Sequence, residues 1–161
     1  MASGSCRKTE KAGQSFGPLP RAYFGPTSAG MSITVSAEDM EALARSVLKE
    51  LPEPFSKHCA DVVLAIEDFA TPDQLASVGL IDRWELSGLY EGRPLPEQSI
   101  WHSGEMPPRI WLFRMPLMAE MRATRVSLEA LVRHVVIHEA GHHFGFSDAE
   151  MHALEAQAAG G

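Results

Sequence analysis

The sequence predicts an α+β fold, in which a small, mostly antiparallel or mixed sheet packs on an N-terminal helix and on a long helix near the C-terminus. Apolar residues recur at helical spacing in these two segments, and short β-branched or aromatic segments lie between them. Apolar residues also make up 45% of the 161-residue chain, which is enough for a hydrophobic core of its own.

The first helix is predicted over residues 36–51. Ser36 is followed three residues later by Asp39, a pattern typical of a helix start, and apolar side chains then repeat every three or four residues. Residues 61–69 (DVVLAIEDF) are β-branched and apolar, so they predict a strand.

A short helix is predicted after this strand. Thr71 and Pro72 have the residue types of a helix cap and a first helical position, and this helix should end near Gly79. Residues 84–92 are irregular and contain two glycines, so we expect a turn or the start of a strand there.

Two strands are predicted over residues 99–102 and 109–114, joined by a loop that contains glycine and proline. An antiparallel pairing between them fits such a connection. A short helix should follow from Pro116 to about Arg122.

The second long helix is predicted over residues 127–144, where apolar side chains again form a stripe. Gly145 stands where a helix often ends in a left-handed residue. Ser147 and Glu150 predict a capping box for a last helix, which should reach about residue 157.

The domain organisation follows from this pattern. Residues 1–30 are rich in glycine and proline without periodicity, and we expect a flexible tail. Residues 31–157 should form a single domain, followed by a flexible C-terminus at 158–161.

Charge and hydropathy exclude two classes of partner. The formal net charge of −7 argues against a nucleic-acid binder. No apolar run approaches the roughly 20 residues of a membrane helix, and the N-terminus lacks the features of a secretory signal. We therefore expect a cytoplasmic protein without a membrane partner; the sequence does not predict its oligomeric state.

The segment from His138 to Asp148 (HEAGHHFGFSD) contains the pattern His-Glu-x-x-His. On a helix, His138 and His142 are one turn and about 40° apart, so both imidazoles can reach one metal ion. Glu139 lies about 60° from His142, where it can hydrogen-bond a water on the metal without being a ligand. This spacing is typical of a zinc-dependent peptidase.

Asp148 is the predicted third ligand. Gly145 can end the helix in a left-handed turn and return Asp148 toward the metal, which gives an open site of two His, one Asp and a water. Asp148 would also stabilise the N-terminus of the next helix without any metal. The alternative third ligands are His152 and Glu155, which lie further along that helix.

Two further histidines flank the pattern. His134, one turn before His138, is expected either to support the ligands or line the cleft, or to be a structural histidine. His143 points about 120° away from His138 on a helix, so we expect it to face solvent or to contact the ligands from behind.

Tyr90 allows two interpretations. Its hydroxyl could stabilise the oxyanion of a tetrahedral intermediate, but a buried aromatic packed beside Gly88 and Gly92 is favoured. Three other aromatic residues are expected in the core or the cleft wall: Trp101, Trp111 and Phe113.

Residues 133–148 (RHVVIHEAGHHFGFSD), together with 88–92 (GLYEG) and 107–113 (PPRIWLF), resemble the small bacterial zincin-like metallopeptidase family. The likeness extends over about residues 36–155. It implies a minimal zincin-like fold, with a few-stranded sheet over an active-site helix and no large C-terminal subdomain.

The resemblance also implies a set of roles. Glu139 would be the general base, and Zn²⁺ would be bound by His138, His142 and Asp148. The better-known metzincins carry a third histidine in place of Asp148, and Met151 lies too close in sequence to form their methionine turn.

The sequence therefore predicts one of two functions. The first is a zinc metallopeptidase that hydrolyses a peptide or protein substrate, with Glu139 as general base. The second is a catalytically silent module that binds a peptide or protein, with a structural metal or none.

Overall fold

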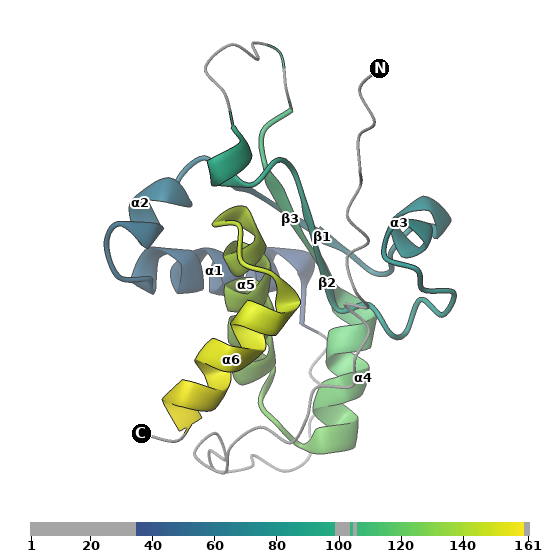
Figure 1. Ribbon diagram of the computed structural model, residues 1–161. Coiled ribbons are helices and arrows are strands. Elements are labelled where there is room, and N and C mark those ends of the chain that lie inside the picture. Colours follow the sequence, from purple (N-terminus) through teal and green to yellow (C-terminus); the bar gives the residue numbers. More distant parts are fainter. Residues whose placement is uncertain (1–34, 99–103, 105, 160–161) are drawn as a thin grey trace.

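The computed structural model describes residues 35–98, 104 and 106–159, with side chains described as far as Ala153. It contains a three-stranded mixed sheet in the order β1-β3-β2 (Figure 1). The strands β1 (Val63–Glu67) and β3 (Arg109–Phe113) are parallel, whereas β2 (Gly88–Glu91) pairs antiparallel with β3. The prediction of an α+β fold with a small mixed sheet is confirmed.

Six α-helices are found in the described residues, and a 3₁₀ turn at Leu95–Glu97 follows β2. The helices are α1 (Ala37–Glu50), α2 (Phe55–His58), α3 (Pro72–Ser77), α4 (Arg114–Thr124), α5 (Leu128–His143) and α6 (Asp148–Ala159). Among these residues, no helix is long and apolar enough to cross a bilayer.

Local capping explains where several helices begin. The Ser36 hydroxyl accepts a hydrogen bond from the Asp39 amide at 3.1 Å, as predicted for α1. Thr71 and Gln74 form a capping box at the start of α3, and Ser127 accepts from the Ala130 amide at the start of α5. The predictions of these helices are confirmed.

Several boundaries differ from the predictions. The strand predicted over 61–69 is shorter, and α4 begins at Arg114 directly after β3 rather than at Pro116. The antiparallel partner of β3 is β2, in the segment expected to be a turn or strand start. The strand predicted over 99–102 lies outside the described residues, and the short helix α2 was not predicted.

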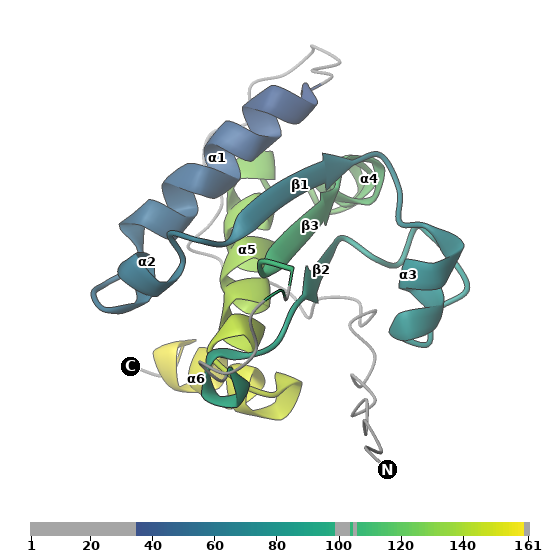
Figure 2. The same ribbon diagram turned by 90° about the horizontal axis from the view of Figure 1, so that it is seen from above.

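The sheet has a core on each face, and Figure 2 shows α1 and α5 on one side and α3 on the other. The larger core joins α1 and α5 to one face of β1 and β3, and it includes Met40, Leu64, Ile110, Leu112 and Val136. The smaller core lies between α3 and the opposite face, and it includes Leu75, Leu89 and Phe113. Strand β3 is therefore buried on both of its faces.

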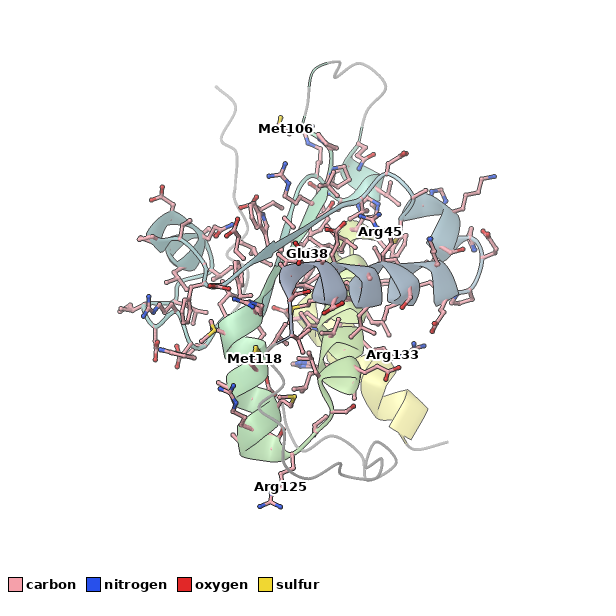
Figure 3. The ribbon with its side chains drawn as sticks, turned by 180° about the vertical axis from the view of Figure 1, so that it is seen from behind. Glu38, Arg45, Met106, Met118, Arg125 and Arg133 are labelled. Carbon is pink, nitrogen blue, oxygen red and sulfur yellow. The ribbon has the colours of Figure 1, made fainter. Side chains whose placement is uncertain are left out.

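An ion pair at the surface joins the two long helices. Arg133 of α5 lies 2.7 Å from Glu50 at the end of α1, and Figure 3 shows Arg133 near α1 in the view from behind. Because both side chains are about half exposed, the pair contributes little compared with the core beneath it.

Candidate metal centre and active site

The two predicted histidine ligands lie on the last turns of α5. The ring centroids of His138 and His142 are 5.0 Å apart, with an interplanar angle of 80°. The preceding turns of the helix are anchored in the larger core through Leu131, Val132 and Val135. Helix α5 therefore presents both imidazoles from a rigid support.

Helix α5 ends in a tight left-handed turn. Gly145 has a φ of 89°, and its amide donates to the carbonyl of His142 at 3.0 Å. The Phe146 amide donates to the carbonyl of Gly141, also at 3.0 Å. These two bonds form a Schellman motif, which favours glycine at the residue with positive φ. The chain reverses here, so α6 starts beside the histidines.

Asp148, the first residue of α6, contacts both histidines. Its Oδ1 lies 3.1 Å from Nε2 of His138 and 3.2 Å from Nε2 of His142. One ligand atom from each of the three side chains lies within 4.8 Å of the others. Since the ligand atoms of a tetrahedral zinc ion are about 3.3 Å apart, the three residues fit this metal.

The hydrogen bond made by His142 points a lone pair at Asp148. Its Nδ1 lies 3.1 Å from the carbonyl oxygen of Phe146, and because a carbonyl can only accept, Nδ1 carries the proton. In the neutral ring Nε2 then carries none, although it faces a carboxylate oxygen. This tautomer leaves the lone pair of Nε2 available to a metal ion. A backbone bond of this kind also orients metal-binding histidines.

His138 is adapted to the neutral form that binds metal. It is only 9% exposed, and this burial lowers its pKa, with a smaller lowering from the nearby His142. Asp148 acts in the opposite direction. His134, which is half-buried one turn earlier, also lowers the pKa of His138 through its charge.

Glu139 of α5 is almost fully buried on the side of the helix that faces β2. It is 5% exposed, and burial raises the pKa of its carboxyl group to about 8, although a hydrogen bond to the backbone of Tyr90 opposes this shift. A Cβ added at Gly88 would collide with Val135 and lie 3.4 Å from Cγ of Glu139. Gly88 therefore allows β2 to approach the part of α5 that carries Glu139.

Among the described residues, no strand pairs with the edge of β2 that faces away from β3. The amide of Phe113 donates to the carbonyl of Ser87 at 2.9 Å. This bond shows which residues of β2 direct their backbone groups toward β3 and which direct them away. In such a pair every second residue turns its backbone groups away from the partner strand. These residues in β2 are Gly88 and Tyr90, and the backbone of Tyr90 reaches Glu139.

The side chain of Tyr90 binds His143 and packs beside Gly92. Its hydroxyl lies 2.9 Å from Nδ1 of His143, while Nε2 of that ring lies 3.2 Å from the carbonyl of His58. Since the carbonyl of His58 only accepts, Nε2 carries a proton. The Tyr90 hydroxyl also donates to the carbonyl of Arg93 at 3.2 Å, so this carbonyl and Nδ1 of His143 are two acceptors for its single proton. Both contacts engage the hydroxyl within the fold, which favours the packing interpretation over the oxyanion role.

The expectation that His143 faces solvent is wrong. Its side chain is 1% exposed, because α2 and β2 cover this side of the helix through the carbonyl of His58 and the hydroxyl of Tyr90. This burial lowers the pKa of His143. Neither contact was predicted, because α2 was not expected and the two contacts join residues 85 and 53 positions apart in the sequence.

The other predicted residues that the structure describes lie outside the group of three. His152 is exposed, and its ring centroid is 6.4 Å from that of His138. The side chain of Glu155 lies outside the described residues, as does Trp101. Phe113 is fully buried, and half-buried Trp111 donates from Nε1 to Glu91 at 2.7 Å.

Comparison with known proteins agrees with this architecture. Residues 59–158, more than half of the chain, match a family described as zincin-like metallopeptidase. No curated protein sequence matches the chain. The matched region contains the whole sheet together with α5, and it includes His138, Glu139, His142 and Asp148. The chain belongs to the zincin-like metallopeptidase family.

Proposed function

We propose that the protein is a zinc-dependent peptidase in which His138, His142 and Asp148 hold the metal and Glu139 is the general base. The observation that carries this proposal is the convergence of three ligand atoms within 4.8 Å of one another, next to a carboxyl group that is almost fully buried. A buried carboxyl with a raised pKa beside such a cluster is typical of a catalytic acid or base.

Zinc, when bound, would supply Lewis acidity to a water molecule and to the scissile carbonyl. The Glu139 carboxylate would accept a proton from the attacking water and return it to the leaving amine. The backbone of Tyr90 would hold the carboxylate in one orientation during both transfers. Burial favours proton retention on Glu139 between the two steps, since burial raises its pKa.

The substrate proposed for this site is an extended peptide or an unfolded segment of a protein. The outward backbone groups of β2 that do not hold Glu139 can pair with such a chain, which would give affinity with weak sequence selectivity. Beyond the strand, the surface continues into a hollow of about 400 Å³ that can receive substrate side chains. It is lined by Gly92, Arg93, Pro94, Glu97 and Met106.

The test compares the wild type with Glu139→Gln, both loaded with zinc, on a peptide library analysed by mass spectrometry. We expect cleavage by the wild type and a rate lower by about 10² to 10⁴ in the variant, which is the usual contribution of a general base. Zinc content measured on the same samples is the control, because glutamine at 139 leaves all three proposed ligands in place.

The same experiment addresses the catalytically silent alternative. Equal turnover by the two proteins would remove Glu139 from the mechanism. Absence of cleavage by both, with full zinc content, would instead favour a module that binds peptides or proteins without hydrolysing them.

A further inference from the structure

Within residues 148–153 of α6, one side chain is buried. Met151 is 6% exposed, Asp148 is half-buried, and the remaining side chains of this stretch are exposed. Because burial of apolar surface is the main force that docks a helix, Met151 is the principal apolar anchor of the described part of α6.

Met151 packs against Gly141 on the active-site helix. A Cβ added at Gly141 would collide with Sδ of Met151 and lie 2.8 Å from its Cε. Gly141 is inside a helix and is not among the glycines with positive φ, so the backbone does not require glycine there. Glycine in a helix costs about 1 kcal/mol relative to alanine, and here the close approach of Met151 accounts for it.

This contact lies beside the proposed metal ligands in both helices. Gly141 immediately precedes His142, and Met151 is three residues after Asp148 in the first turn of α6. The amide of Met151 donates to the carbonyl of Ser147 at 2.9 Å, so this turn is rigidly helical. A displacement of Met151 therefore moves Asp148 with it.

On each side of the candidate metal centre, a glycine allows another element to approach closely. On α5, Gly141 is about 60° from His138, on the side opposite to Glu139. Figures 1 and 2 both show α6 beside the C-terminal end of α5. A glycine thus admits β2 on the Glu139 side, and a second glycine admits α6 on the other side.

From this geometry we infer that Met151, seated on Gly141, is a positioning residue that sets the distance of Asp148 from the two histidines. The inference rests on the proposed zinc site. Met151 is not itself one of the proposed ligands, and it would act through the placement of α6.

The test measures zinc affinity in two variants. Met151→Ala removes the apolar side chain, and Gly141→Ala fills the space that this side chain occupies. We expect zinc binding to weaken by about 10- to 100-fold in each, the usual effect of losing a group that orients a ligand. Met151→Leu keeps an apolar side chain of similar volume and should restore most of the affinity. The visible spectrum of the cobalt-substituted proteins should show the altered coordination in the two alanine variants.

Met118→Ala is the matched control. Met118 is another buried methionine, 3% exposed, and lies on α4, where it is labelled in Figure 3. Its loss should lower the thermal stability of the zinc-free protein but leave zinc affinity and the cobalt spectrum unchanged. This control separates a positional effect of Met151 from general destabilisation.

Two outcomes would overturn the inference, and they differ from each other. Wild-type affinity for zinc in both Met151→Ala and Gly141→Ala would overturn it while leaving the proposed function intact. A wild-type protein that binds no zinc would overturn the proposed function together with the inference.

Discussion

At the scale of single residues, substitution of Asp148 distinguishes a metal ligand from a charge that only stabilises a helix end. In Asp148→Asn the amide has a similar volume but no charge. If Asp148 binds zinc, we expect the affinity to fall by orders of magnitude, because one of three protein ligands is lost. If it only stabilises the helix N-terminus, the cost should be about 0.3 to 1 kcal/mol of stability. Zinc titration and calorimetry on the same variant distinguish these results.

Glu150→Gln is the control for this prediction. Glu150 is acidic, lies in the same first turn of α6 and accepts hydrogen bonds from Ser147. Loss of its carboxylate should lower the stability of the protein only by weakening the N-terminal cap of α6. Equal zinc affinity in Asp148→Asn and Glu150→Gln would reject the two-His, one-Asp site and direct attention to His152 or Glu155.

The pKa of Glu139 predicts how the stability of the zinc-free protein depends on pH. Its folded pKa of about 8 exceeds the ordinary glutamate value of 4.5, so between these values the folded state binds more protons than the unfolded state. Stability contributed by this group should therefore fall as pH rises through that window. The full loss is on the order of 5 kcal/mol for a shift of this size.

Urea unfolding in the presence of a chelator at pH 5 and pH 9 tests this behaviour. Relative to the wild type, Glu139→Gln should become more stable on going from pH 5 to pH 9, because glutamine does not ionise. The lowered pKa values of His138 and His143 affect both proteins and cancel in the comparison. The same stability difference at both pH values would contradict the prediction.

At the scale of elements, the contact between β2 and α5 depends on the absence of a side chain at Gly88. Gly88→Ala would force a methyl group into Val135, and we expect a loss of about 1 to 3 kcal/mol, as for other overpacked cores. Val135→Ala should relieve the collision, so the double variant should be more stable than the sum of the two single effects. Additive losses in a double-mutant cycle would show that the two positions are independent.

Local signals explain why most helices could be predicted. The caps at Ser36, Thr71 and Ser127 are formed by residues within three positions of each other, and the end of α5 requires only Gly145 and its neighbours. The spacing of His138, Glu139 and His142 is likewise fixed by the helix itself. These features depend on short stretches of chain, which a single sequence contains in full.

Contacts between distant segments could not be predicted in the same way. The pairing of β2 with β3 and the bond between Tyr90 and His143 join segments about 20 and 53 residues apart. Alternation of apolar residues shows which residues share a face, but it does not choose the neighbouring strand. The seat of Met151 on Gly141 depends on how α6 docks, and a glycine in a helix gives only an unspecific signal of close approach.

At the scale of the whole molecule, the site lies where three layers of contacts meet. The larger core packs α5 against α1 and the sheet. Strand β2 covers the side of α5 that carries Glu139, and α6 covers the side that carries Gly141. The metal centre therefore depends on the arrangement of the domain, although all of its proposed ligands lie within eleven consecutive residues. Disruption of the larger core around α5, which does not include Met118, should weaken zinc binding through α5 as well as through loss of the folded state.

The proposed start of the domain predicts the effect of truncation. Deletion of residues 1–30 keeps Val35, whose carbonyl accepts from Arg114 at 3.0 Å, and keeps the Ser36 cap of α1. The free energy of unfolding and the zinc affinity should then match the full chain within about 0.5 kcal/mol. Deletion of residues 1–36 removes the cap and that carbonyl together, and it should cost at least about 1 kcal/mol. Urea unfolding of both truncated proteins checks this, and a substantial loss in the shorter deletion would place the start of the domain before residue 31.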